Sequence, residues 1–262
     1  MTKEQGGGQE QLVIDTFDTK APTYAAGYEG DSGTAHSFTI RRQRVYEMVG
    51  DRRKGRMLDV GCGPGVTADY FVKRGFDLYG VDIAPEMIRQ CGETFAGVDR
   101  AHFSVGVIEK LEFPDGFFDV VTAMGVVEYI EDDARAVAEM ARVTRPGGIV
   151  IVTLPNAWSP FRIWQRTVYN GFRSLARAVT GRGKAPAGIV HREYRERAYC
   201  RLLEAHGLRV ADVVYYNFRV IVFPLDRLMP GVTVALSRAL ERFGRGPLRW
   251  LGTGLIVKAE KA

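Results

Sequence analysis

The sequence predicts an α/β fold in which helices cover both faces of a doubly wound, mostly parallel sheet of seven strands. Seven short apolar runs lie between Arg56 and the end of the chain, and the first five alternate with stretches of helical periodicity. These runs are apolar at consecutive positions, which is typical of parallel strands buried on both faces. With 262 residues, the chain is long enough to bury such a core within one domain.

The five strands of the alternating part are expected at 56–61, 77–82, 101–106, 117–124 and 149–154. The helices between them are expected at 66–74, 85–95 and 132–144. Pro85 suits the first turn of the second helix, and the "RPGG" after Thr144 stops the third. Further along the chain we expect a helix at 195–206, a strand at 209–216, an amphipathic helix at about 232–243 and a strand at 254–261. We expect this last strand to lie at an edge of the sheet.

Two insertions break this rhythm, at about 155–192 and 217–250, and the sequence predicts that they form a helical cap after the fifth strand. The whole of 13–262 is expected to be one domain, preceded by a polar, glycine-rich and flexible tail at 1–12. No apolar run approaches the roughly 20 residues of a membrane span. The three cysteines are widely spaced and form no C-x-x-C pair. Both features predict a cytoplasmic protein without a disulfide or zinc framework.

Charge is distributed unevenly along the chain. Residues 1–139 carry 15 Lys and Arg against 24 Asp and Glu, a net charge of −9, and residues 140–262 carry 21 against 7, a net charge of +14. The two sum to the formal net charge of +5. A basic half indicates an anionic partner, namely a phosphate-bearing substrate, a membrane surface or nucleic acid, unless it is simply a solvated face.

A glycine-rich turn, "LDVGCGPG" at 58–65, ends the first predicted strand. Glycines let the backbone approach a ligand closely, and the helix that follows offers free N–H groups. The turn also fits the G-x-G-x-x-A pattern of dinucleotide-binding proteins, but Asp59 and the proline inside the loop favour another ligand. Asp82 ends the second strand, where a carboxylate can accept both hydroxyls of a ribose or cap the next helix.

Two more segments, "LEFPDGFFDVV" at 111–121 and "VTRPGGIVIVT" at 143–153, follow in order. With these motifs the chain, over roughly 13–154, resembles the class I S-adenosylmethionine (SAM) methyltransferases, in particular the type 11 and ubiquinone-biosynthesis-like enzymes. The resemblance implies a Rossmann-like fold with SAM as cofactor. The cofactor-binding residues that it implies are Tyr24, Arg41, Asp59, Gly61, Cys62, Gly63, Gly65, Asp82, Ile83, Met87, Val107, Ile108, Glu109 and Met124.

Within this set the resemblance implies distinct roles. The glycines would lie along the methionyl and ribose portions, and Ile83 and Met87 would pack on the adenine. "FDTKAPTY" at 17–24 resembles the segment that covers the cofactor, so Tyr24 would lie over SAM while Arg41 or Arg42 pairs with its carboxylate. Many relatives carry an aspartate where this chain has Val107. We therefore expect backbone groups at Ile108, together with Glu109, to read the adenine.

A second departure concerns "MGVVEYIED" at 124–132, which would face the reacting sulfur. The ubiquinone-type enzymes have "EVxEH" here and use it to bind a divalent metal, but this chain has Gly125, Glu128 and Tyr129 at those positions. The sequence therefore predicts no metal. Glu128 is expected to contact the substrate in catalysis, or to be a polar loop residue. His191 is a candidate for removing a proton from a hydroxyl acceptor, or a loop histidine bonded to the backbone.

The first insertion contains "WSPFRIWQRTVYNGFRSLARAVTGRGK" at 158–184, with six basic residues and no acidic one. At helical spacing, one face collects apolar residues, namely Phe161, Trp164, Val168, Phe172, Leu175 and Val179, and another face collects Arg162, Arg166, Arg173 and Arg177. We expect this helix to cover the active site, to lie on an anionic membrane surface, or both. A helix docked on the core with its arginines in solvent is the plainer alternative.

The function expected from the resemblance is transfer of a methyl group from SAM to a heteroatom, oxygen above all, of a hydrophobic or lipid-like small molecule. A soluble specialised metabolite is an alternative acceptor. An RNA methyltransferase is disfavoured because the N/D-P-P-Y signature of base-amine methylation is missing where the chain reads "AMGVVEY", so no nucleic-acid partner is expected. An NAD-dependent oxidoreductase would rest on the G-x-G-x-x-A match alone.

Overall fold

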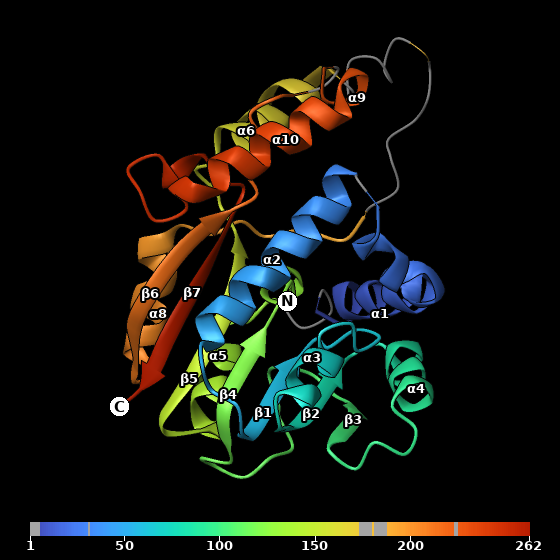
Figure 1. The fold of residues 1–262 in the computed structure, drawn as a ribbon, viewed down its shortest axis with the longest axis vertical. Helices are drawn as coiled ribbons and strands as arrows, with labels where there is room; N and C mark the ends of the chain where they lie inside the picture. The colour runs from blue at the N-terminus through green and yellow to red at the C-terminus, as the bar shows by residue number, and fades with distance from the viewer. Residues whose placement is uncertain (1–5, 31, 173–179, 181–187, 223–224) are drawn as a thin grey trace.

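The computed structural model describes residues 6–30, 32–172, 180, 188–222 and 225–262, and it shows one seven-stranded sheet flanked by helices (Figure 1). The strands are β1 (Gly55–Val60), β2 (Phe76–Asp82), β3 (Ala101–Val105), β4 (Phe118–Ala123), β5 (Thr144–Pro155), β6 (Leu208–Tyr216) and β7 (Gly254–Lys261). Their order in the sheet is β3-β2-β1-β4-β5-β7-β6. The predicted fold class is confirmed.

The site is placed by the parallel part of the sheet. β1 pairs in parallel with both β2 and β4, with Leu58 opposite Tyr79 on one side and Val121 on the other. From β1 the strand order runs outward in both directions, so the connections that leave the carboxyl ends of β1 and β4 diverge. In open α/β sheets this switch point is where ligands bind.

Helices cover both faces of the sheet because successive strand residues point to opposite sides and are apolar on both. On one face, α2 (Gly33–Val49) and α3 (Ala68–Lys73) pack with Met57 and Phe71 in a shared core. On the other face, α5 (Asp133–Val143) and α8 (Glu196–Ala205) pack with Leu58. The start of α5 is fixed by Asp132, whose carboxylate accepts a hydrogen bond of 3.0 Å from the Arg135 amide.

The N-terminal helix differs from the expected flexible tail. α1 (Gly6–Tyr24), followed by the 3₁₀ helix η1 (Ala25–Tyr28), takes up 6–12, while 1–5 lie outside the described residues. α1 packs on α4 (Pro85–Thr94), where Asp18 Oδ1 accepts a hydrogen bond of 2.9 Å from the Glu86 amide. Ala21 is buried there against Ala84 and Met87. Docking of an apolar face therefore stabilises a helix that local composition does not predict.

β7 was expected at an edge of the sheet, and this prediction is wrong. β7 lies between β5 and β6 and pairs antiparallel with both. Leu255, Ile256 and Val257 are fully buried, and the charged residues Lys258, Glu260 and Lys261 follow them towards the end of the strand. β6 occupies the edge instead.

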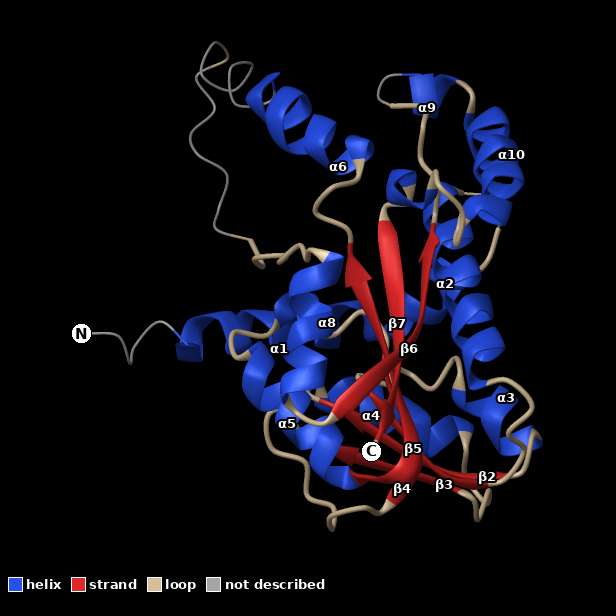
Figure 2. Ribbon diagram, turned by 90° about the vertical axis from the view of Figure 1, so that its left-hand side faces the viewer, coloured by secondary structure: helices blue, strands red, loops and turns tan. Residues whose placement is uncertain are grey.

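Both insertions stand beyond the carboxyl ends of the parallel strands, at one end of the molecule (Figure 2). Their elements are α6 (Pro160–Trp164), the π-helical turn η3 (Gln165–Tyr169), α9 (Leu225–Leu228), α10 (Pro230–Leu240), η4 (Glu241–Phe243) and η5 (Arg249–Leu251). The helix predicted from 161 is observed as far as Phe172. Arg173, Leu175, Arg177 and Val179 lie outside the described residues. In the part of the chain that is described, no helix combines the length and apolar character needed to cross a bilayer.

Of the four arginines expected to form a cationic face, the structure describes Arg162 and Arg166, and both approach an acidic residue. Arg166 pairs with Glu193 at 2.6 Å, and Arg162 approaches the same carboxylate at 3.7 Å. The Nε of Arg162 also donates to the carbonyl oxygen of Thr253 at 2.8 Å. The acidic residue that pairs with these arginines, Glu193, follows the insertion at 155–192. Counting acidic residues within the insertion therefore does not reveal the pairing.

Candidate active site

The glycine turn after β1 is shaped by its neighbours. Gly61 has a φ of 67°, and a Cβ there would collide with the side chain of Val126, so the close approach of the two chain segments requires glycine. The amide of Gly61 donates to the carbonyl oxygen of Val81 at 2.6 Å. The turn is thereby held against the end of β2.

Asp82 fastens the same turn through its side chain. Its Oδ2 accepts a hydrogen bond of 2.8 Å from the Gly63 amide, and its Oδ1 accepts one of 2.9 Å from the Ala84 amide. Burial raises the pKa of Asp82, although the amides of Ala84 and Gly63 oppose this. Each oxygen keeps lone pairs for further donors, so Asp82 holds the turn and the residue that precedes α4 and remains able to bind hydroxyl groups.

Asp59 lies below the turn and does not line a cavity. It is 1% exposed, and its carboxylate accepts hydrogen bonds from the hydroxyls of Thr67 at 2.7 Å and Thr122 at 2.8 Å. Burial raises the pKa of Asp59 to about 6, against the effect of these two hydrogen bonds. The structure therefore gives Asp59 a supporting position beneath the turn.

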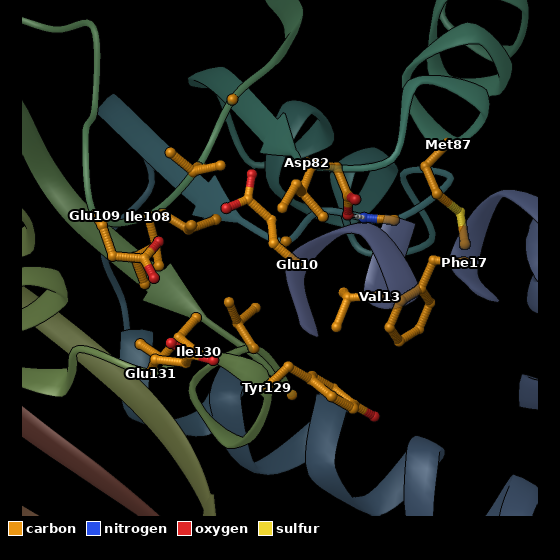
Figure 3. A pocket seen from close by; sticks show the side chains of 18 of the residues that line it. Glu10, Val13, Phe17, Asp82, Met87, Ile108, Glu109, Tyr129, Ile130 and Glu131 are labelled. Atoms are coloured by element: carbon orange, nitrogen blue, oxygen red, sulfur yellow. Dashed lines mark hydrogen bonds between the residues drawn. The ribbon is translucent and has the colours of Figure 1, made fainter. Parts of the chain in front are cut away.

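A cavity of about 470 Å³ opens at the carboxyl ends of the strands, between the glycine turn and α1 (Figure 3). It brings together most of the cofactor-binding residues that the sequence implies, namely Tyr24, Gly61, Gly63, Asp82, Ile83, Met87, Val107, Ile108, Glu109 and Met124. Cys62, Gly65 and Arg41 are not among its lining residues. The thiol of Cys62 donates to the Gly63 carbonyl at 3.5 Å, and Gly65 packs against Phe95.

α1 supplies lining residues that sequence reasoning missed. Gln9, Glu10, Val13 and Phe17 line the cavity, and Figure 3 shows Val13 and Phe17 turned towards it. Phe17 meets Tyr129 edge to face, with ring centroids 5.3 Å apart. Phe17 begins the segment at 17–24 that was expected to cover the cofactor, whereas the signal for the residues before it was the spacing of Val13 and Phe17, four residues apart on one helical face. α1 thus forms the lid of the cavity.

At one end of the cavity, the chain turns sharply after β3. The amide of Lys110 donates to the carbonyl oxygen of Val107 at 3.2 Å, and Ile108 between them is buried. Burial raises the pKa of Glu109, and the negative charges of Glu10 and Asp132 raise it further. Val107, Ile108 and Glu109 all line the cavity, so the structure brings together the three residues expected at the adenine edge.

A second cavity, of about 290 Å³, adjoins the first. The two share Phe17, Tyr24, Gly125 and Tyr129 as lining residues. Arg41 lines this second cavity, and its guanidinium lies 5.1 Å from the Phe38 ring centroid and close against Gly125. Arg42 lies over Tyr28 and lines neither cavity.

Glu128 is the acidic group of the second cavity. It lies in the 3₁₀ turn η2 (Val127–Tyr129), is 8% exposed, and its Oε2 has no hydrogen-bond partner among the described residues. Burial raises the pKa of Glu128, and the nearby Arg41 and Arg162 oppose this. A buried carboxylate oxygen without a donor is costly, so a ligand that presents an O–H or N–H group would stabilise it.

His191 lies next to this region without lining either cavity. Its ring meets that of Tyr129 edge to face at 4.7 Å. Its surroundings desolvate the ring and lower its pKa, and the positive charges of Arg162 and Lys20 lower it further. A histidine kept neutral in this way is able to accept a proton.

The three positions that bind a metal in the ubiquinone-type enzymes are side by side here as Gly125, Glu128 and Tyr129. Among the residues that the structure describes, no cluster of three His, Cys, Asp or Glu side chains is arranged to hold a metal ion.

Known proteins resemble the chain over this region. A family model for a methyltransferase domain matches 58–152. The 2-methyl-6-phytyl-1,4-hydroquinone methyltransferase of a Synechocystis strain is 30% identical over 67% of this chain and 54% of its own length. The malonyl-acyl-carrier-protein O-methyltransferase of Serratia marcescens is 30% identical over 58% of this chain and 55% of its own. The chain thus spans about half the length of these curated relatives.

Among solved structures, a methyltransferase in complex with the Haloferax volcanii Trm112 activator superposes with a TM-score of 0.64, at 19% identity, over 95% of this chain and 96% of the other. At this identity the likeness shows the fold. It covers both the parallel sheet and the insertions.

We expect Asp82→Ala to weaken SAM binding about 10- to 150-fold, because a charged hydrogen bond contributes roughly 1.5–3 kcal/mol. Titration calorimetry measures this. Asp77→Ala, on the exposed side of the same strand, is the matched control and should bind as the parent does. Equal SAM affinity in both variants would show that Asp82 does not bind the cofactor.

We also expect Asp59→Asn to change how stability depends on pH. The pKa of Asp59 is about 6 in the folded protein, above the usual 3.8, so the folded state binds this proton more tightly and loses stability as the pH rises through that range. Asparagine does not ionise. The free energy of unfolding of the variant should therefore gain on the parent by up to about 3 kcal/mol between about pH 4 and pH 7.

Denaturant titrations at several pH values test this, with Asp119→Asn as the control of opposite sign. Burial raises the pKa of Asp119, but hydrogen bonds from Arg145 and the Arg56 amide outweigh this and lower it. The Asp119→Asn variant should therefore lose stability relative to the parent as the pH rises. A pH-independent difference for Asp59→Asn would contradict the burial argument.

Proposed function

This chain belongs to the class I SAM-dependent methyltransferases, and from that premise we propose that it transfers a methyl group to an oxygen atom of a hydrophobic small-molecule acceptor. The observation that carries the proposal is the adjoining pair of cavities. One has the glycine turn and Asp82, and the other has a buried carboxylate without a donor. Their shared wall of Tyr24, Gly125 and Tyr129 is where the two ligands would meet.

The residues of the first cavity fit SAM, which supplies a methyl group on a positively charged sulfur. Asp82 would accept the ribose hydroxyls, and the backbone near Gly61 and Gly63 would lie along the ribose and methionyl portions. Ile108 and Glu109 would read the adenine. A Cβ on Gly63 would lie 3.6 Å from the Tyr24 ring, an ordinary van der Waals contact, so Tyr24 lies directly beside the turn. Arg41 would pair with the methionyl carboxylate from the second cavity.

The second cavity would hold the reacting end of the acceptor. Phe17, Tyr24, Phe38 and Tyr129 give it aromatic walls, which favour an apolar acceptor. Glu128 Oε2 would accept the hydrogen bond of the acceptor hydroxyl. Alignment of the hydroxyl oxygen is the main task of these residues, because holding two reactants in place removes much of the barrier.

A proton must leave the hydroxyl, and two residues are placed to take it. Glu128 lines the second cavity and has a raised pKa and a buried oxygen without a hydrogen-bond partner, so we propose it as the first acceptor of the proton. His191, with its lowered pKa, would receive the proton near Tyr129 at the rim. General-base catalysis of this kind contributes about 10²- to 10⁴-fold in rate.

The acceptor proposal also draws on the relatives and on the cap. The relative from Synechocystis is named for a phytyl hydroquinone, an apolar acceptor, and the relative from Serratia is named as an O-methyltransferase. Among the described residues, eleven of the twelve exposed large apolar side chains lie in the two insertions, Val105 being the exception. Such a concentration favours contact with a membrane surface that presents the acceptor. A soluble metabolite enclosed by the cap is the alternative.

We expect Glu128→Gln to lower methyl transfer to a lipid extract about 10²- to 10⁴-fold while SAM affinity is unchanged, because glutamine cannot accept the proton. In the parent, activity should fall with acidification through the raised pKa of Glu128, since the base must be ionised. Label transfer from radioactive SAM measures the activity of the variant and the pH dependence of the parent. Glu112→Gln, an exposed loop residue, is the control. Loss of activity in His191→Ala but not in Glu128→Gln would assign the base to His191.

For the cap, we expect the double variant Phe172→Ser and Leu228→Ser to bind phosphatidylglycerol vesicles at least about 10-fold more weakly than the parent in a sedimentation assay. These side chains are 68% and 72% exposed, and burying each fully contributes roughly 1.5–3 kcal/mol. Val105→Ser, the exposed apolar residue outside the insertions, is the matched control. If the parent itself stays in the supernatant, the acceptor comes from solution and the soluble-metabolite alternative holds.

A further inference from the structure

Residues 190–194, which we call the strap, contact several of the elements that surround the site. Val190 meets the lid helix α1, His191 meets the ring of Tyr129, and Arg192 meets the loop after β4. Glu193 binds the cap helix, and Tyr194 binds the end of β5. Consecutive residues of one short segment thus hold elements that are far apart in the chain.

The contact with the lid is a pair of hydrogen bonds to one side chain. Gln9 Nε2 donates to the carbonyl oxygen of Val190 at 3.2 Å, and the Val190 amide donates to Gln9 Oε1 at 3.4 Å. Gln9 also lines the first cavity, together with Glu10, Val13 and Phe17 of the same helix. Any movement of the lid that admits or releases a ligand must therefore break or carry along this pair.

Arg192 makes most of the hydrogen bonds between the strap and the loop after β4. Its amide donates to the Glu128 carbonyl oxygen at 2.9 Å, and its Nη1 donates to the carbonyl oxygens of Ile130 and Glu131 at 3.0 Å each. The guanidinium also pairs with Asp133 at 2.9 Å. The planar fork of arginine suits several acceptors at once. Arg192 thereby fixes the backbone that carries Glu128 and Tyr129.

The far end of the strap is anchored in the sheet. The Tyr194 amide donates to the Pro155 carbonyl at 2.9 Å, and its hydroxyl donates to the Val127 carbonyl at 2.7 Å. Tyr194 is buried. This anchor gives the strap a fixed point, so the lid and the loop after β4 are positioned relative to the sheet through the same five residues.

The strap residues line neither cavity, so they act on ligands only through the elements they hold. We propose that Gln9 and Arg192 are positioning residues of methyl transfer. Closing the lid over the first cavity fastens the strap through Gln9, and the strap orders the Glu128 loop through Arg192. Filling the cofactor cavity thus prepares the acceptor cavity. This rests on the proposed function, because it takes the first cavity as the cofactor site and the second as the acceptor site.

Hydrogen exchange of the full chain with and without S-adenosylhomocysteine tests the coupling. The amides of Val190, Arg192 and Tyr194 donate to Gln9, Glu128 and Pro155, respectively. They should exchange about 5-fold or more slowly when the ligand is bound, which is the lower end of typical coupling between sites. In Gln9→Ala the ligand should still protect α1 and the glycine turn, but protection of the strap should disappear. Gln11→Ala, whose side chain bonds only within α1, is the matched control and should match the parent.

Arg192 is tested on the loop at 127–133. Arg192→Met should abolish its ligand-induced protection, and Arg192→Lys should restore part of it, because lysine keeps the charge opposite Asp133 but cannot reach both carbonyls. Arg209 on β6 forms a similar ion pair with Glu260, so Arg209→Met is the control and should behave as the parent does. Partial rescue separates positioning from a general loss of fold.

Two outcomes overturn the coupling. One is protection of α1 in the parent without any change in the strap, and the other is an identical response of Gln9→Ala and Gln11→Ala. If S-adenosylhomocysteine protects no segment at all, it is the proposed function that fails and not the strap. The Gln9 variants carry the test even if Arg192→Met does not fold, since Gln9 lies on the surface of α1 and contributes no core packing.

Discussion

The carboxylate of Asp82 is the interaction around which the site is organised. At the end of β2 it accepts the amides of Gly63 and Ala84, so it holds the glycine turn and the start of α4 at once. Those amides lie beyond the strand ladders and have no other partner in them, and a buried N–H group without an acceptor is costly. The position of the turn decides where Val126, Tyr24 and α1 can approach. The first cavity is therefore a consequence of where this carboxylate stands.

Much of the fold follows from local patterns. The apolar runs, the helix-starting Pro85 and the glycine turn all depend on residues close in sequence. The strands that they predict are found within one residue of the expected bounds, except that β5 begins five residues earlier than expected. The residues around Gly63 and Asp82 could be predicted as a cofactor site because a turn and a strand end are themselves local. The family and the cofactor followed from the same motifs.

What sequence reasoning missed depends on partners that are distant in the chain. α1 is helical because Ala21 packs on an apolar surface at Ala84 and Met87, which the composition of a glycine-rich tail does not predict. The central position of β7 depends on which strands lie beside it, and its own apolar pattern does not carry that information. Arg166 is neutralised by Glu193, 27 residues further on. The same distance hid the contacts of Arg192, whose acceptors are mostly backbone carbonyls and so leave no mark in the amino-acid pattern.

The pairing of β7 with both β5 and β6 also limits the loss of folding stability that the cap can cause. Each insertion leaves the sheet after one strand and returns to it at another, so each behaves as a loop whose ends the sheet holds. The entropy of closing such a loop grows only with the logarithm of its length, by about 0.6 kcal/mol per doubling. The first insertion, whose helical segment at 160–169 has no buried residue, is thus a part that can lengthen, shorten or be exchanged between enzymes with little penalty to stability. In the second insertion, α10 buries Thr233, Val234 and Ser237 and packs on α2. Acceptor choice could diversify in evolution on an unchanged sheet, and an engineer could graft a different cap onto the same cofactor site.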